Sequence, residues 1–164
     1  MTVVVETNVL ATANHHADHA SPGCVLRCID ALQDIHDRKV VLVDDAMRIF
    51  DEYRRYASPS GKPGLGDIFM KWLWDNRAQH HICRQITITP KLMDKEDFEE
   101  FPDDPDLQSF DRSDRKWVAV ALASGLNPPI LNATDTDWWH HRTALARLGL
   151  RVEFLCLELM TEKR

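Results

Sequence analysis

Four acidic side chains lie at or near the ends of elements that the sequence predicts, and their type points to metal chemistry. Glu6 follows the valine run 3–5, and Asp135 follows the apolar stretch PPILN. Glu52 lies in the helical pattern AMRIFDEYRRY, and Asp114 opens SDRKWVAVALASG. Ligand sites in parallel α/β sheets lie beyond the carboxyl ends of the strands. We therefore expect these four carboxylates to converge on one edge of a sheet.

Carboxylates that gather without Lys or Arg between them repel one another and do not all stay ionised unaided. Hard divalent cations such as Mg²⁺ or Mn²⁺ relieve this repulsion and prefer oxygen ligands. Such ions lower the pKa of a bound water and offset the charge that develops on a phosphoryl group. The pattern therefore predicts phosphodiester hydrolysis without a covalent intermediate.

Each acid has an alternative reading or a competing neighbour. Asp51 competes with Glu52 for the position that borders the apolar face of its helix. Asp135 is the first acid after its strand, whereas Asp137 is either a further ligand or the N-cap of the next helix. Asp114 is also where the helix dipole favours a carboxylate, whether or not a metal binds there.

Strands that alternate with helices predict an α/β fold with a mainly parallel sheet. Ser21 as N-cap and Pro22 as first residue predict the start of one helix, and Gly125 predicts the end of another. A helix over 67–79 is expected to direct Ile68 toward the core, and the acidic stretch 95–111 is expected to be a loop or short helix. The expected strands are 3–5, 39–45, 82–90 and 150–159, together with one that lies within PPILNATDTDWW (128–139) and ends in acids. At 164 residues the chain predicts a single domain, 1–164.

The composition is that of an ordinary soluble globular protein, with 44% hydrophobic and 28% charged residues. Its net charge of −6 argues against a protein that coats nucleic acid passively, but not against an enzyme whose carboxylates bind cations. The sequence has no apolar run of membrane-spanning length and no signal-peptide pattern, so we expect a cytoplasmic location.

The four cysteines show no disulfide framework, and a domain of this size does not require one. Cys24 and Cys28 lie one helical turn apart, which suits packing. A second reading joins them to His15, His16 and His19 as a zinc site, although the spacing matches no standard structural zinc pattern.

Four segments together resemble the motifs of PIN-domain nucleases. VVVETNVL resembles the D-T-N opening of that family, and DEYRR resembles its second acidic motif. SDRKWVAVALASG is similar to the D-x-x-x-x-A-x-A helix, and ILNATDTDW to the strand that brings the last acid. The resemblance keeps the family's order over roughly 2–156, although each motif alone is weak.

The resemblance implies a three-layer α/β/α sandwich and metal-dependent cleavage of RNA. Glu6, Glu52, Asp114 and Asp135 match the family's catalytic, metal-binding acids, with Asp137 as an added metal ligand. Thr7 and Asn8 match the polar residues that support the first acid. Many single-domain members are toxins of toxin–antitoxin pairs and form homodimers, which implies an antitoxin partner and a homodimer here.

Two features leave other readings open. The family generally has Asp where this chain has Glu6, which favours a degenerate module that acts through protein binding. A phosphatase-like hydrolase of small molecules is a third reading. Arg54 and Arg55 form either a rim that binds a phosphate backbone or a solvated helix face. His140 and His141 are expected to be exposed, and Trp138 and Trp139 to serve as core or groove wall rather than as base-stacking platforms.

Overall fold

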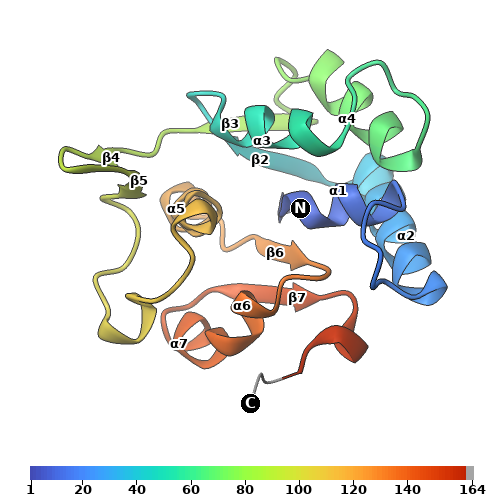
Figure 1. Cartoon of the computed structure of the whole chain (residues 1–164). Helices are drawn as coiled ribbons and strands as arrows, with labels where there is room; N and C mark the ends of the chain where they lie inside the picture. Colours follow the sequence, from blue (N-terminus) through green and yellow to red (C-terminus); the bar gives the residue numbers. More distant parts are fainter. Residues whose placement is uncertain (162–164) are drawn as a thin grey trace.

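A five-stranded sheet lies at the centre of the protein in the computed structural model, which describes residues 1–161 (Figure 1). The strand order is β3-β2-β1-β6-β7, and every neighbouring pair is parallel. The strands are β1 (Thr2–Val5), β2 (Val40–Asp44), β3 (Cys83–Ile86), β6 (Pro129–Asn132) and β7 (Arg151–Phe154). The predicted α/β class with a parallel sheet is therefore confirmed.

Helices flank this sheet and connect its strands. They are α1 (Thr7–Ala13), α2 (Pro22–Arg38), α3 (Arg48–Tyr56), α4 (Leu65–Asp75), α5 (Arg115–Ser124), α6 (Thr136–His140) and α7 (Arg142–Arg147). Short 3-10 helices cover Pro105–Leu107, Arg112–Asp114 and Leu157–Leu159. None of the helices in the part of the chain that the structure describes has the length and apolar character needed to cross a membrane.

Two helix boundaries follow directly from local chemistry. The Ser21 side chain accepts a hydrogen bond from the Cys24 backbone N–H, and Pro22 takes the first position of α2. Helix α5 ends at Gly125, whose φ of 67° is in the left-handed region that favours glycine. Both predicted boundaries are confirmed.

The core forms where apolar strands meet apolar helix faces. The central strands β1 and β2 contribute valines with no exposed surface, because helices cover the sheet. Helix α5 contacts both strands as well as β6, and it contributes the fully buried Trp117. Trp138, at the start of α6, is also fully buried, which excludes it as an exposed base-stacking platform.

The region 95–111 differs from the sequence prediction. Strand β5 (Asp94–Phe98) pairs antiparallel with β4 (Pro90–Lys91) to form a hairpin, where a loop or short helix was expected. Phe98 is buried, and the Asp97 carboxylate forms ion pairs with Lys91 and Arg115, both at 3.1 Å. Contacts with distant residues thus stabilise a strand in a sequence of low β propensity.

Three further expectations were wrong in detail. Ile68 of α4 is 54% exposed, because it lines an apolar groove beside α2 rather than the core. The last strand ends at Phe154, and residues 157–159 form a 3-10 helix. His141 is mostly covered, since it contacts the Phe110 ring and hydrogen-bonds with Ser109.

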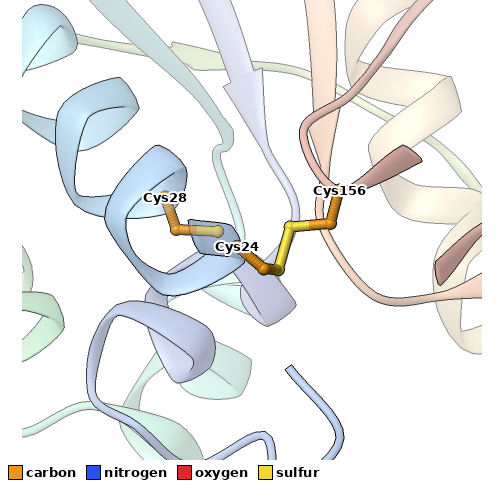
Figure 2. A group of neighbouring side chains, drawn as sticks. All are labelled: Cys24, Cys28 and Cys156. Atoms are coloured by element: carbon orange, nitrogen blue, oxygen red, sulfur yellow. A yellow bond between two sulfur atoms is a disulfide. The ribbon is translucent and has the colours of Figure 1, made fainter. Parts of the chain in front are cut away.

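A disulfide joins Cys24 of α2 to Cys156, just beyond β7 (Figure 2). The expectation of cysteines without a disulfide is therefore wrong for Cys24 and Cys156. Cys28 lies one turn further along α2 as a buried free thiol. The two bonded residues are 132 positions apart, which is why no local pattern could pair them.

Candidate active site: an acidic pocket beside a cationic groove

The four predicted acids line one pocket at the carboxyl ends of the central strands. Its volume is about 330 Å³, and we call it the acidic pocket. Its lining consists of Glu6, Thr7, Asn8, Glu52, Arg55, Tyr56, Asp111, Ser113, Asp114 and Asp135. Segments more than 120 positions apart in the sequence therefore contribute carboxylates to a single pocket.

The parallel sheet places two of these acids side by side. Val5 pairs with Leu131, so β1 and β6 end together, and the Glu6 N–H continues the pairing to the Leu131 carbonyl at 3.0 Å. Glu6 then stands at the N-terminus of α1 without capping it through its side chain. Asp135 follows β6 as the N-cap of α6, where its side chain accepts the Asp137 N–H at 2.9 Å.

An amide network holds Glu6 in place. Asn8 donates to the Glu6 carboxylate and to Asn132 Oδ1, the latter at 2.7 Å. The Asn8 side-chain oxygen Oδ1 accepts the Ala133 N–H at 2.8 Å, which ties α1 to the end of β6. Because each of these groups has a partner, the carboxylate of Glu6 is oriented before any ligand arrives.

Burial and mutual repulsion disfavour the charged forms of two acids. The pKa of Glu6 is raised to about 8, mainly by burial and secondly by the negative charges of Glu52 and Asp135. Burial likewise raises the pKa of Asp114 to about 10, with Glu6 and Asp135 as the next contributors. The pocket thus has more carboxylates than it can keep ionised by itself.

Asp114 carries the clearest sign of a missing partner. Its Oδ2 is buried and has no hydrogen-bond partner in the structure, and its side chain does not cap α5. A buried polar atom without a partner costs free energy, so such an atom needs an explanation. A favourable interaction with the helix dipole explains why a carboxylate stands at the start of α5. It does not explain why Asp114 Oδ2 is buried without a hydrogen-bond partner.

Glu52 differs from the other three acids because it has a cationic partner. Its carboxylate accepts from Lys116 Nζ at 2.7 Å and from the Thr7 hydroxyl. Asp51, the competing neighbour, faces outward and pairs with Arg54 at 3.8 Å. The choice of Glu52 over Asp51 thus agrees with the direction in which each side chain points.

The structure does not place Asp137 in the acidic pocket. Its carboxylate accepts the Asp111 N–H at 2.9 Å and lies 3.2 Å from His141 Nδ1. It is also not the N-cap of the next helix, because Asp135 occupies that position. Asp137 therefore supports the loop that carries Asp111 on the rim.

A second cavity, of about 290 Å³, adjoins the acidic pocket, and we call it the cationic groove. It shares Glu52, Arg55 and Ser113 with the pocket. Its lining consists of Arg48, Asp51, Glu52, Arg55, Lys95, Glu96, Phe98, Arg112, Ser113 and Lys116. The lining holds five basic residues against three acidic ones. Two of the five, Arg48 and Arg112, pair with Asp44 and Asp94, which lie outside the lining.

The two predicted rim arginines have different positions. Arg55 lines both cavities and has no ion-pair partner among residues 1–161. Arg54 instead lies over the Trp74 ring, with its guanidinium carbon 4.1 Å from the ring centroid. Arg77 also lies over this ring, 3.8 Å from the same centroid. Only Arg55 is therefore in a position to contact a ligand in the pocket.

Sequence reasoning missed Lys116, Ser113 and the groove residues from the hairpin. Lys116 follows Asp114 by two positions, but no local sequence pattern indicates that a lysine of α5 pairs with Glu52, which is 64 positions away. Lys95 lies in the stretch that was not predicted to form a strand. Its place in the same groove as Arg55 depends on the fold alone.

The acidic residues fit a hydrated hard cation better than a tightly caged one. In the described part of the chain, only the sulfurs of Cys24, Cys28 and Cys156 lie within 4.8 Å of one another as a group of three candidate ligands. The carboxylates are spread more widely. Mg²⁺ keeps several of its waters and needs few protein ligands, so this wider spacing suits it.

Comparison with known proteins adds no assignment: no family model, curated protein or solved structure matches this chain. The function must therefore be inferred from the geometry and electrostatics of the pocket and the groove.

Proposed function

We propose that this chain is a PIN-like nuclease, with a three-layer α/β/α arrangement, that hydrolyses RNA phosphodiesters with Mg²⁺ or Mn²⁺. The observation that carries the proposal is the set of three carboxylates in one pocket, of which Glu6 and Asp114 are buried and Asp135 is half-buried. Within the described residues, none of the three accepts a hydrogen bond from a basic side chain, as Glu52 does from Lys116. A divalent cation is the simplest ligand that makes these charges compatible.

The donor set determines which ion the pocket accepts. Glu6, Asp114 and Asp135 offer oxygen ligands only, and Asp114 Oδ2 is already free of other hydrogen bonds. A bound Mg²⁺ or Mn²⁺ supplies Lewis-acid chemistry, because it lowers the pKa of a water and offsets charge on a phosphate. Glu52 lines the same pocket, where Lys116 and Thr7 fix its orientation.

The cationic groove supports a polymeric substrate over a small phosphate ester. Arg55 stands at the junction of the two cavities, where it can hold the phosphate next to the one that is cleaved. Lys95 and Arg112 lie further along the groove, on or near the hairpin. Basic side chains that continue away from a reaction centre bind successive backbone phosphates.

A toxin role with a homodimer and an antitoxin partner belongs to this proposal. Strand β7 is an edge strand of the sheet, so its outer backbone groups are open to pairing with a second chain. In this view an antitoxin silences the enzyme by covering the acidic pocket or the groove.

Cleavage of a labelled RNA, with either Mn²⁺ or EDTA, tests the proposal. We expect cleavage with Mn²⁺ that Asp114→Asn lowers at least about 100-fold, since residues that only support a metal ligand already cost 10–100-fold. Asp75→Asn is the matched control, because Asp75 is half-exposed and pairs with Lys71 on the outside of α4. A wild type without metal-dependent cleavage, or an equally active Asp114→Asn, would contradict the proposal. A generic phosphate ester serves as the comparison substrate for the phosphatase-like reading.

A protein-binding module without catalysis is the second candidate, and one observation favours it. Leu92 and Met93, at the tip of the β4–β5 hairpin, are 97% and 98% exposed. Two adjacent bare hydrophobic side chains on a projecting hairpin suit a contact with another protein. A chain that binds no Mn²⁺ at the acidic pocket would support this reading.

A further inference from the structure

Three cysteine sulfurs meet in the core, away from the residues that line the acidic pocket. Cys24 and Cys28 come from α2, and Cys156 comes from the segment after β7 (Figure 2). All three side chains are fully buried, and their sulfurs lie within 4.8 Å of one another. We call these residues the sulfur cluster.

We infer that, in the reduced protein, the sulfur cluster is a binding site for a soft divalent ion of the zinc type. In the oxidised protein the Cys24–Cys156 disulfide joins α2 to the C-terminal segment. In the reduced protein the ion makes the same connection through three sulfurs. The site thus changes its ligand with the redox state while the two segments stay joined.

Contacts on both sides of the cluster keep the sulfurs together after the disulfide is reduced. Arg27 Nε donates to the Leu155 carbonyl at 2.6 Å, and the Arg27 guanidinium also pairs with Glu158. Ser21 donates to the same Glu158 carboxylate at 3.2 Å. These bonds flank the cluster in both segments, so the three thiols form a preorganised set of soft ligands.

The surroundings favour thiolates once a metal is present. Cys24 is in the first turn of α2, a 17-residue helix whose N-terminus carries partial positive charge. The Arg27 guanidinium, one residue before Cys28, adds a positive charge close to the cluster.

Thr12 lies beside the sulfur cluster. Its hydroxyl is fully buried. It faces the Cys28 sulfur and donates a hydrogen bond to it. A hydroxyl in this position donates to a metal-bound thiolate, as the groups that support metal ligands commonly do.

The chemistry balances with a phosphine or dithiol reductant as the source of electrons. Two electrons and two protons convert the disulfide to the thiols of Cys24 and Cys156. One Zn²⁺ or Co²⁺ then displaces up to three protons from the three thiols and leaves a fourth ligand position for water. A two-electron oxidant, such as a small-molecule disulfide that is itself reduced to two thiols, would convert the Cys24 and Cys156 thiolates back to the disulfide. Cys28 would then take up a proton and the ion would be released.

Co²⁺ titration of the full chain tests the inference, after phosphine reduction and removal of the reductant without air. We expect thiolate-to-cobalt charge-transfer absorption that saturates at one thiolate-bound Co²⁺ per chain and that Zn²⁺ abolishes by displacement. Disulfide-containing protein should not develop this absorption. A thiol count in denaturant should give two free cysteines before reduction, Cys28 and Cys83, and four after it.

Single substitutions separate the cluster from other thiols and from the acidic pocket. Cys28→Ser should weaken Co²⁺ binding more than about 100-fold, because it removes a direct ligand. Cys83→Ser is the matched control, since Cys83 is the other buried free cysteine and lies on β3. Asp114→Asn should leave the absorption unchanged, because carboxylates give no thiolate band.

Two results would overturn the inference: no thiolate absorption in the reduced wild type, or full Co²⁺ affinity in Cys28→Ser. Cys28→Ala and Cys156→Ser provide two further removals, and near-UV circular dichroism confirms that each variant is folded. The outcome is independent of RNA cleavage, so a failed nuclease assay does not affect it.

Discussion

The acidic pocket and the sulfur cluster are both groups of potential metal ligands, but they differ in how their groups are satisfied. In the acidic pocket Asp114 Oδ2 has no partner, and the pKa values of Glu6 and Asp114 are raised by burial and by neighbouring charges. In the sulfur cluster, two of the three sulfurs are joined covalently and the third is a neutral thiol. The acidic pocket therefore contains carboxylates that repel one another, whereas the disulfide of the sulfur cluster already stabilises the fold.

This difference suggests different roles for the two regions. Groups that destabilise the folded state persist when they perform a function, because stability and activity compete at such sites. A disulfide between distant segments mainly stabilises the fold. Changes to the two regions should therefore have opposite effects on stability, and the following measurements test that contrast.

Reduction of the Cys24–Cys156 disulfide should have the largest effect. We expect the free energy of unfolding to fall by about 2–5 kcal/mol, because the bond closes a long loop. Urea unfolding of oxidised and reduced protein, with a chelator present, measures the change. Cys24→Ser should respond to reductant hardly at all, and an unchanged wild-type midpoint after reduction would contradict the stabilising role.

Asp114→Asn should have a smaller effect of the opposite sign. In EDTA we expect its melting temperature to rise by about 2–4 °C, corresponding to a gain on the order of 1 kcal/mol for a chain of this size. The amide removes a carboxylate that burial and its neighbours disfavour. Scanning calorimetry of wild type and variant, in EDTA and in Mn²⁺, measures the melting temperatures without and with metal. Mn²⁺ should raise the melting temperature of the wild type more than that of the variant. A lower melting temperature in EDTA would show that Asp114 is stabilised as a charge.

The third effect is a pH dependence at Glu6, whose pKa is raised less than that of Asp114. Unfolded Glu6 loses its proton near pH 4.5, but folded Glu6 keeps it up to about pH 8. Unfolding within this window releases a proton, so the stability contribution of Glu6 is present below pH 4.5 and is lost as pH rises to 8. Glu6→Gln should flatten this part of the stability curve of the metal-free protein in urea titrations. An identical slope in both proteins would contradict the raised pKa.

Much of the fold was accessible from sequence because its signals are local. The valine runs of β1 and β2, the Ser21–Pro22 helix start and the Gly125 stop each depend on neighbouring residues. The hairpin β4–β5 was missed because its strands are held by Arg115 and by the burial of Phe98. Such contacts leave no periodic pattern.

For the acidic pocket, sequence order and element type located the four carboxylates, since parallel strands bring their carboxyl ends to one edge. They could not decide which of two adjacent acids points inward. Asp51 and Glu52 differ only in their angle around α3, and Asp137 is directed away by Asp111. They also gave no sign that Lys116 binds Glu52.

The sequence by itself determined that an α/β sheet forms and that acids follow its strands, because hydrophobic periodicity and helix capping act over a few residues. Only the tertiary structure decided that Cys24 pairs with Cys156, that Asp114 keeps an unpartnered oxygen, and that a cationic groove adjoins the acids. These features depend on contacts between residues far apart in the chain, whose geometry exists only once the sheet has assembled.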